Sequence, residues 1–271
     1  MNISNKTFIV TGGGNGLGRE LVLNLLKRGN NVIAFDINEF ALQETNKLAG
    51  DLKSRFSPVT VDITNKDLID DLVDKTIATF GQIDGIINNA GVIQPFTTLE
   101  NTDYATIKKV FDINFFGTLY MIKAFLPHLL TRPEAWIVDV SSMGGFLPVP
   151  GQAIYGASKA AVKILTESLA SELDGTNVHV TTVFPGAIAT DIKANSGLGK
   201  DAGVNASDCD EIPKGLLSPA TAADIIIKAT EHKKVRSYVG NDAKLMFRWY
   251  RAFPNWASKI IGKKVKENHK L

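Results

Sequence analysis

The sequence predicts an α/β fold in which a doubly wound, mostly parallel sheet of seven strands carries helices on both faces. Short β-rich runs alternate along the chain with longer segments of helical periodicity, which is the pattern of such folds. The runs at 32–35 and 137–140 are too apolar for strands with one face in water, so we expect parallel strands covered on both sides. The chain has 271 residues, 44% of them hydrophobic, which is enough for one domain with a large core.

Seven strands and six long helices are expected. The strands lie at 7–11, 31–36, 57–62, 83–88, 136–141, 178–184 and, more weakly, 236–240. Helical periodicity predicts helices at 17–28, 39–49, 66–79, 102–130, 152–173 and 219–232. Ser218 as an N-cap and Pro219 as the first helical residue support the last helix. The longest irregular stretch, 185–217, follows the sixth strand and therefore lies at the carboxyl edge of the sheet, where ligands bind in such folds.

The chain divides into a main domain at 1–240, which includes the loop 185–217, and a basic amphipathic tail at 241–271. From Lys233 onward, eleven Lys and Arg residues stand against two acidic residues, so this part carries a net charge of +9 and the rest about −7. The negative main domain argues against a general nucleic-acid-binding surface.

The tail has one apolar face. Five large residues share it at helical spacing: Leu245, Met246, Trp249, Tyr250 and Phe253. We expect this face to pack over the ligand cleft or on another subunit, because aromatic stripes are more often buried in protein. The alternative is that 243–266 contacts anionic lipid. Phe247 lies off the stripe and fits neither interpretation.

Cysteine content and hydropathy predict a cytoplasmic protein, with peripheral membrane contact as the alternative. Cys209 is the only cysteine, which excludes an internal disulfide. The chain opens on polar residues and runs directly into the first strand, so we expect no signal peptide. No apolar stretch approaches the ~20 residues of a membrane span.

Residues 11–18 predict a phosphate-binding turn between the first strand and the first helix. Glycines allow the backbone to turn tightly and approach a pyrophosphate, whose charge the N–H groups at the helix start can meet. The spacing Gly12-x-x-x-Gly16-x-Gly18 departs from the commonest dinucleotide fingerprint. We expect a dinucleotide to bind here, to Gly12, Asn15, Gly16, Leu17 and Gly18.

Asp36, at the end of the second strand, favours NAD over NADP. Its carboxylate can accept hydrogen bonds from a ribose diol and would repel a 2′-phosphate. No basic residue occupies position 15 or 37, as a phosphate would require. Arg19 is the residue most able to change this preference, and Asp36 as a strand-ending turn residue is the structural alternative.

Tyr155 and Lys159 lie four residues apart and therefore share one helix face. A cation about 5 Å from a phenol, at an effective dielectric near 20, is worth roughly 3 kcal/mol, on the order of two pK units. Lys159 is thus expected to lower the pKa of Tyr155 toward neutral pH. Partial burial would raise it again, so a second positive charge such as an oxidised nicotinamide would help. Alone, such a pair is common by chance.

Together these motifs resemble the short-chain dehydrogenase/reductase family in its compact, single-domain branch with a Rossmann-type fold. The resemblance runs from about Lys6 to Gly240. It rests on the glycine turn, Asp62 as an adenine contact, Asn88-Asn-Ala-Gly91 after the fourth strand, Asn114, the set Ser142, Tyr155 and Lys159, and Pro185-Gly186 after the sixth strand.

The resemblance implies roles for these residues. Tyr155 would exchange a proton with the substrate oxygen, Ser142 would hold that oxygen, and Lys159 would lower the tyrosine pKa and bind the nicotinamide ribose. Asn114 would hold a water that links Lys159 to solvent. Further cofactor contacts are implied at Asp62, Ile63, Asn89, Ala90, Gly91, Pro185, Gly186, Ile188 and Thr190.

Structural alternatives exist for several of these residues. Asn114 could be a helix-interior polar group bonded to nearby backbone, and Ser142 a strand cap. Thr190 could cap a helix that begins at Asp191. Asn88 is expected to tie strands together rather than to act in catalysis.

We expect an NAD-dependent oxidoreductase that interconverts a hydrophobic secondary alcohol and its ketone, with no metal. The predicted substrate wall is apolar and has no arginine to grip a carboxylate: Met143, Phe146, Leu147, Pro148, Val149 and Ile188. A 3-oxoacyl or hydroxysteroid reductase is the alternative within the fold. A non-catalytic NAD-binding sensor or scaffold is the alternative of another class, although it would not need the complete Asn, Ser, Tyr and Lys set. The glycine spacing disfavours a sugar epimerase. The family resemblance implies a homodimer or homotetramer.

Overall fold

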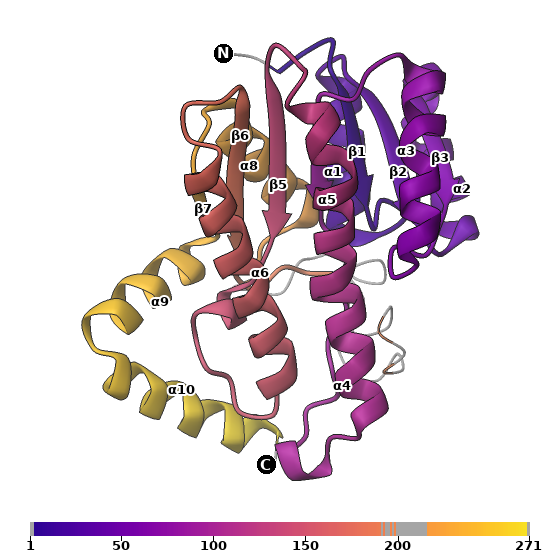
Figure 1. Ribbon diagram of the computed structural model, residues 1–271. Helices are drawn as coiled ribbons and strands as arrows, with labels where there is room; N and C mark the ends of the chain where they lie inside the picture. Colours follow the sequence, from indigo (N-terminus) through magenta and orange to yellow (C-terminus); the bar gives the residue numbers. More distant parts are fainter. Residues whose placement is uncertain (1–2, 191, 193–195, 197, 199–215, 270–271) are drawn as a thin grey trace.

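The computed structural model describes residues 3–190, 192, 196, 198 and 216–269, and its centre is one seven-stranded sheet (Figure 1). The strand order is β3-β2-β1-β4-β5-β6-β7, and every neighbouring pair is parallel. The strands are β1 Thr7–Thr11, β2 Asn31–Asp36, β3 Phe56–Thr60, β4 Gly85–Asn88, β5 Ala135–Val140, β6 Val178–Pro185 and β7 Arg236–Val239. The predicted doubly wound fold is confirmed, and the sheet is parallel throughout.

Helices cover both faces of this sheet. They are α1 Gly16–Lys27, α2 Glu39–Ala49, α3 Lys66–Phe80, α4 Tyr104–Phe111, α5 Thr118–Leu129, α6 Ala153–Glu172, α8 Pro219–Glu231, α9 Asn241–Ala252 and α10 Pro254–His269. The expected N-cap of α8 is present, since the Ser218 hydroxyl accepts from the Thr221 N–H at 3.1 Å. Asn15 caps α1 by accepting from the Gly16 N–H at 2.7 Å.

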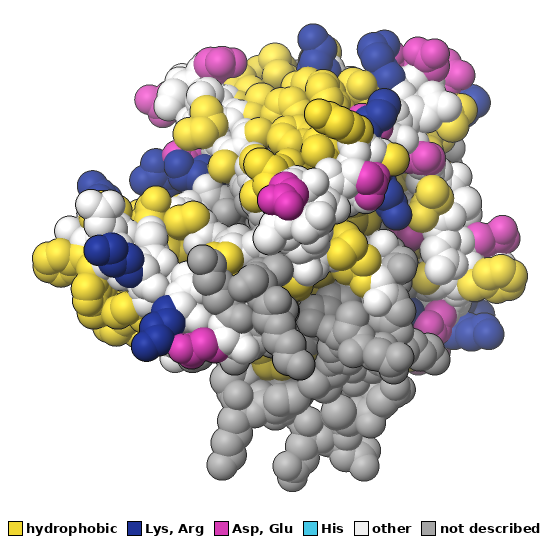
Figure 2. Space-filling model, turned by 90° about the horizontal axis from the view of Figure 1, so that it is seen from below, with side chains coloured by type: hydrophobic (Ala, Val, Ile, Leu, Met, Phe, Trp, Pro, Cys, Tyr) yellow, Lys and Arg dark blue, Asp and Glu magenta, His cyan; other side chains and the backbone are white. Residues whose placement is uncertain are grey.

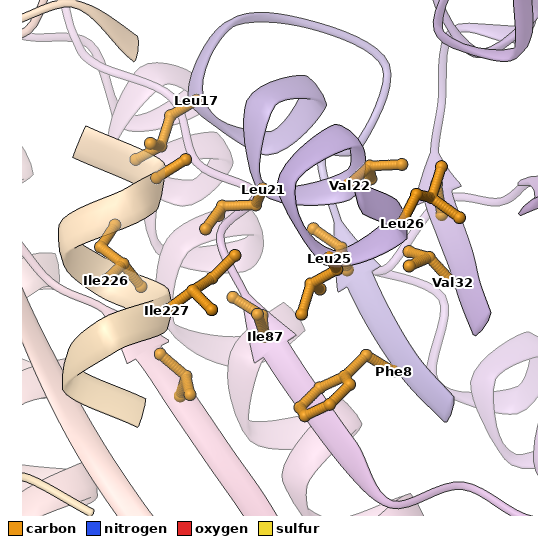
Figure 3. Close-up of a cluster of buried hydrophobic side chains, with 14 of the residues drawn as sticks. Phe8, Leu17, Leu21, Val22, Leu25, Leu26, Val32, Ile87, Ile226 and Ile227 are labelled. Carbon is orange, nitrogen blue, oxygen red and sulfur yellow. The ribbon is translucent and has the colours of Figure 1, made fainter. Parts of the chain in front are cut away.

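The core has two apolar layers, one on each face of the sheet. On one face, Leu21 and Leu25 of α1 and Ile226 and Ile227 of α8 pack on Phe8 and its neighbours in the strands (Figure 3). On the other face, α3, α5 and α6 pack on the side chains of Ile9, Ile33 and Ile137. Alternate residues of one strand thus enter opposite layers, which explains continuous apolar runs such as 32–35 in β2.

The sheet order reverses at β1 and β4, which lie side by side although two strands separate them in sequence. The chain turns toward β2 and β3 on one side and toward β5, β6 and β7 on the other. A crevice forms between the loops that follow β1 and β4 at such a switch point. The cofactor and catalytic motifs all follow strand ends and therefore lie at this edge.

The predicted single helix at 102–130 is divided. Between α4 and α5 the backbone widens into a π-helical turn, η3 Asp112–Gly117, with Asn114 in it. Such turns insert one extra residue into a helix and redirect the side chains around it. Helical periodicity alone could not indicate this widening.

The C-terminal tail forms two helices, α9 and α10, that extend from the end of β7 along one side of the molecule (Figure 1). Pro254 ends α9 and opens α10, because proline has no N–H to continue the first helix. Within the described residues, none of the helices combines the length and the apolar character that crossing a membrane requires.

Candidate active site

A cleft of about 520 Å³ opens at the carboxyl edge of the sheet. The glycine turn, the ends of β2, β4 and β5, the start of α6 and the segment after β6 line it. Every residue predicted for cofactor binding lies on its wall, and so does Ser142. Asn114 is buried behind that wall. The topology has therefore brought the separate motifs to one site.

The glycine turn leaves room for a ligand that approaches the backbone closely. Gly12 and Gly16 adopt φ angles of +66° and +50°, which favour glycine. A Cβ on Gly18 would lie 1.9 Å from the Gly12 carbonyl oxygen, so no side chain fits there. The first N–H groups of α1 have no partner within the helix and face the cleft. This cradle fits a pyrophosphate, and the residues present fit a dinucleotide.

Thr11 fixes the turn to the neighbouring strand. Its hydroxyl accepts from the backbone N–H groups of Asn89 and Ala90, at 3.0 and 3.1 Å. The Asn89 amide returns a hydrogen bond to the Thr11 carbonyl at 3.1 Å. The two loops that flank the crevice are thus held at a constant separation.

Asp36 and Arg19 both bond to the backbone of Gly14 in the glycine turn. One Asp36 oxygen accepts from the Gly14 N–H and the other from the Asn38 N–H, both at 2.9 Å. Arg19 forms an ion pair with Glu44 at 2.7 Å and donates to the Gly14 carbonyl at 2.8 Å. The arginine identified from the sequence as a possible phosphate ligand is therefore bound to a carboxylate.

Ser142, Tyr155 and Lys159 meet in the cleft from two elements. Ser142 follows β5, and its hydroxyl accepts from the Gly144 N–H at 3.0 Å, which caps the short turn η4 Met143–Gly145. The same hydroxyl is hydrogen-bonded to Tyr155. Ser142 thus acts as a cap, as the structural alternative held, and also contacts the tyrosine.

Lys159 is buried one helical turn beyond Tyr155. Its ammonium donates to the Val140 carbonyl at 2.9 Å. A Cβ on Gly91 would lie 3.1 Å from both the Lys159 Nζ and the Asn114 Oδ1, so the glycine lets both groups approach the loop after β4. Asn114 and Lys159 therefore line one small space, as their predicted roles require.

Burial controls the pKa of both groups. It raises the pKa of Tyr155 above its ordinary value, and the hydrogen bond with Ser142 opposes this shift. Burial also lowers the pKa of Lys159 to about 8, with the charge of Asp139 acting in the opposite direction. The shift of the Tyr155 pKa runs opposite to the lowering expected from Lys159, because burial is its largest cause.

Asp139 is a buried carboxylate that sequence reasoning missed. It lies in β5 with no exposed surface, and its two oxygens accept from the Asn88 amide at 2.7 Å and the Thr166 hydroxyl at 2.8 Å. Burial raises its pKa to about 6, while Asn88, Thr166 and Lys159 oppose the shift. An acidic residue inside the apolar run 137–140 was the available signal. The structural role expected for Asn88 is confirmed, since it ties β4 to β5.

Gln94 was also missed as a positioning residue. Its side-chain oxygen accepts from the N–H groups of Ile154 and Tyr155, both at 2.9 Å, so it caps the start of α6 at the tyrosine itself. Gln152 in turn donates to the Gln94 carbonyl at 2.9 Å. Both glutamines are almost wholly buried. Nothing in the spacing of the sequence indicated that residue 94 reaches residue 155.

The Asn114 side chain makes three hydrogen bonds to protein groups. Its amide donates to the Val92 carbonyl at 2.9 Å and to the Ser158 hydroxyl at 3.0 Å, and its oxygen accepts from the Val92 N–H at 2.8 Å. The bonds to nearby backbone match the structural alternative. They also clamp the loop after β4 against α6, beside Lys159.

The expected apolar substrate wall is only partly present. Ile188 lines the cleft, but Leu147 is buried and Phe146 packs on Phe184 and Phe247, with ring centroids 5.7 and 5.4 Å away. The prediction was wrong for Phe146 and Leu147, because β6 and α9 supply an aromatic cluster that binds this segment to the core. The proposed cap of a helix at Asp191 and most of the loop 185–217 lie outside the described residues.

Comparison with known proteins gives independent findings. The family model described as "short chain dehydrogenase" matches residues 6–201. The Mycobacterium tuberculosis protein SadH, which is named as an oxidoreductase, is 32% identical over 243 residues that cover 88% of this chain and 87% of SadH.

Two solved structures show the same fold. A Burkholderia cenocepacia short-chain dehydrogenase in complex with NADP is 28% identical, has a TM-score of 0.79 and covers 96% of this chain and 99% of its own. A Burkholderia phymatum short-chain dehydrogenase/reductase in complex with NAD has a TM-score of 0.82 at 24% identity and covers 93% and 95%. Structural neighbours thus bind either dinucleotide.

Proposed function

Because the chain belongs to the short-chain dehydrogenase/reductase family, we propose that it is an NAD-dependent oxidoreductase that interconverts a hydrophobic secondary alcohol and its ketone. One observation carries the proposal: Ser142, Tyr155 and Lys159 converge in a cleft whose remaining wall fits a dinucleotide. A coarser statement, an oxidoreductase with an NAD(P) site, follows from the family itself.

In this proposal the residues divide the tasks of the site among them. When bound, the nicotinamide ring supplies the hydride acceptor or donor. The Ser142 hydroxyl holds the substrate oxygen, and the Tyr155 hydroxyl exchanges a proton with it. Lys159 binds the nicotinamide ribose and keeps positive charge behind the phenol. Gln94 and Asn114 hold the Tyr155 helix and the loop after β4 in place.

The Tyr155 pKa affects alcohol oxidation and ketone reduction differently. Alcohol oxidation requires the phenolate as a base, and burial opposes its formation. The positive charge of an oxidised nicotinamide would lower that cost, so the site is best prepared for proton removal only when the oxidised cofactor is present. Ketone reduction uses the neutral phenol, which burial favours.

Asp36 and Arg19 support NAD as the cofactor. The carboxylate lies on the cleft wall where a ribose diol would reach it, and the nearby arginine is already paired with Glu44. Direct assays with both cofactors test this part of the proposal. A higher kcat/KM with NADP than with NAD would overturn the cofactor assignment and leave the reaction type intact.

The charges of the cleft support an uncharged, apolar substrate. Among the described residues that line it, Lys159 is the only cation, and it is committed to the catalytic set. Ile188 and Ile192 add apolar surface on the nicotinamide side. A carboxylate substrate would find no arginine fork here.

The test is absorbance at the reduced-nicotinamide band with a panel of secondary alcohols graded by size, together with a hydroxysteroid and a 3-hydroxyacyl thioester. Preference for either of the last two would select the alternative reductase class. Tyr155→Phe should lower kcat by about 10³-fold or more, within the range of general acid–base catalysis, while NAD affinity stays within a few-fold. Full activity in Tyr155→Phe would overturn the mechanism, and NAD binding without turnover on any substrate would favour the sensor or scaffold.

We further propose that the protein is a homodimer or homotetramer. Large apolar side chains are exposed on α4, η3 and α6, among them Tyr104 at 88%, Phe116 at 39% and Ile164 at 57%. Their burial against a second copy would remove apolar surface from water. Light scattering after size-exclusion chromatography gives the mass directly, and a monomer at micromolar concentration would contradict the proposal.

A further inference from the structure

The outer face of α9 and α10 carries large hydrophobic side chains that no described part of the chain covers. We propose that this face binds the surface of an anionic membrane. We call these residues the C-terminal strip: Leu245, Trp249, Phe253, Trp256 and Ile260. Each is between 40% and 64% exposed. Five exposed apolar residues within sixteen positions make a contiguous patch, which on a soluble surface marks an interaction site.

The strip is continuous across both helices. Leu245 and Trp249 lie four residues apart and thus share one face of α9, and Phe253 is the C-cap residue that follows this helix. After the break at Pro254, residues 256 and 260 continue the pattern on α10. The Trp249 and Trp256 rings lie 5.5 Å apart and join the two helices. The two helices therefore present one apolar surface.

The opposite face of α9 is anchored to the main domain. Ala243 is buried, and the Phe247 ring packs 4.4 Å from the Tyr238 ring. The Asp242 carboxylate accepts from the Ala187 N–H at 2.7 Å, beside the cleft residue Gly186. This explains Phe247, which matched neither interpretation of the sequence: its ring packs on the Phe146 and Tyr238 rings and anchors the helix to the main domain. With its inner face occupied, α9 directs the strip outward.

The charge around the strip indicates the partner. Between 243 and 266 there are seven Lys and Arg residues and no Asp or Glu. Five of these cations have exposed side chains, namely Lys244, Arg248, Arg251, Lys259 and Lys263. Figure 2 shows hydrophobic side chains with Lys and Arg beside them at the left edge, where Figure 1 places α9 and α10. Apolar and aromatic side chains next to basic ones are typical of helices that lie in the headgroup region of anionic lipid.

A second copy of the chain fits this face less well. Pairing two strips would bring the positive charges of one segment against those of the other, and the segment offers no acidic residue to balance them. Packing over the cleft is also disfavoured, because no α9 or α10 residue lies among the described residues that line it. The sequence favoured burial of this face in protein over contact with lipid. The structure favours the second interpretation, with anionic lipid as the partner. Tryptophan is also the residue most enriched at membrane–water interfaces.

Vesicle binding by the full chain tests the proposal. We expect co-sedimentation with vesicles of phosphatidylcholine containing a third phosphatidylserine, weaker binding as salt is added, and little binding to pure phosphatidylcholine. Tryptophan emission should shift to shorter wavelength on binding, since Trp249 and Trp256 enter the interface while Trp136 stays buried. No binding to anionic vesicles at low salt would overturn the proposal.

Matched variants separate lipid binding from other effects. Leu245→Ser with Phe253→Ser, and separately Arg248→Glu with Arg251→Glu, should each lower vesicle affinity at least tenfold. Leu48→Ser with Lys47→Glu changes an exposed apolar and basic pair on α2 and should leave binding unchanged. Far-ultraviolet circular dichroism checks that each variant is folded. If the strip variants change the mass in solution but keep vesicle affinity, the face is a subunit interface and the proposal fails.

The assay needs neither cofactor nor substrate, so it is independent of the proposed function. Tyr155→Phe should bind vesicles as the unaltered chain does, whether or not that variant turns over a substrate.

Discussion

The two halves of the cleft are built in different ways. On the cofactor side, a short continuous stretch within 11–18 lines the cleft, and the close approach of one backbone segment to another decides its shape. On the catalytic side, Tyr155 and Lys159 are placed by side chains that are far away in sequence, chiefly Gln94, Asn114 and Asp139. The cofactor side can therefore be recognised in the sequence as a local motif. The catalytic side depends on contacts with residues that lie outside any local motif.

Gly18→Ala should have the largest effect, because it acts on the backbone of the cofactor side. A Cβ there would meet the Gly12 carbonyl oxygen at 1.9 Å, and a backbone carbonyl in a tight turn cannot move aside as a side chain can. At the upper end of overpacking costs, about 3 kcal/mol, NAD affinity should fall about 100-fold. Quenching of tryptophan emission or calorimetric titration measures this affinity.

Gly50→Ala is the matched control for this change. Gly50 has a φ of +56°, and a Cβ added there would have no atom within 4 Å, so its replacement adds backbone strain but no clash. It should lower thermal stability without changing NAD affinity. Equal losses of affinity in the two variants would show that general destabilisation, and not the close approach at Gly18, lowers NAD affinity.

Asp139→Asn tests the buried charge on the catalytic side. The folded chain keeps the Asp139 proton up to about pH 6, whereas an unfolded chain releases it near 3.8, so ionised Asp139 costs stability as the pH rises through this window. Relative to the unaltered chain, the variant should gain stability between about pH 4 and pH 6, up to roughly 3 kcal/mol, and little below pH 4. Urea unfolding of both proteins at a series of pH values measures their difference in stability. Other carboxylates, such as Glu134 with its lowered pKa, contribute equally to both proteins, so their effect cancels in this difference.

The same variant has a kinetic signature. The Asp139 charge raises the pKa of Lys159, so its loss should let that pKa fall further below about 8. If the cationic lysine is needed, the loss of kcat/KM at high pH should then begin at lower pH. A gain in stability with an unchanged pH profile would reduce Asp139 to a purely structural role.

Gln94→Met should have a smaller effect, confined to catalysis. The variant keeps the volume of the side chain but leaves the N–H groups of Ile154 and Tyr155 without their acceptor. Loss of such a cap costs about 1 kcal/mol, so we expect kcat to fall about fivefold as the Tyr155 helix start loosens, with the KM for NAD unchanged. Steady-state kinetics with NAD as the varied substrate separates the two constants.

Two further variants serve as controls for Gln94→Met. Gln94→Glu keeps a side-chain oxygen that can accept from both N–H groups and should restore most of kcat. Gln43→Met, on the exposed face of α2, should change nothing. A rise in the KM for NAD in Gln94→Met would mean that Gln94 supports the cofactor side as well, and the contrast between the two halves would weaken.

The same contrast explains which features the sequence could predict. The strands were found to within two residues because both of their faces are apolar, and every predicted cofactor residue lies on the cleft because each follows a strand end. The widened turn at Asn114, the cap from Gln94 and the packing of Phe146 were not found. Each depends on a contact between segments that are distant in the chain, and helical or strand periodicity carries no information about such contacts.

Glu44→Gln should have the smallest effect and tests the adenosine end of the cofactor side. Arg19 is paired with Glu44, whose side chain is 62% exposed, so the pair is worth no more than about 1 kcal/mol. Its loss frees the guanidinium to approach a 2′-phosphate, and kcat/KM with NADP relative to NAD should rise about threefold. Glu20→Gln, a neighbouring change of the same charge, should leave the ratio unaltered. If Glu44→Gln leaves the ratio of kcat/KM with NADP to that with NAD unchanged, then Asp36 alone sets the cofactor preference. The residues that adjoin the glycine turn would then determine this end of the cofactor side as well.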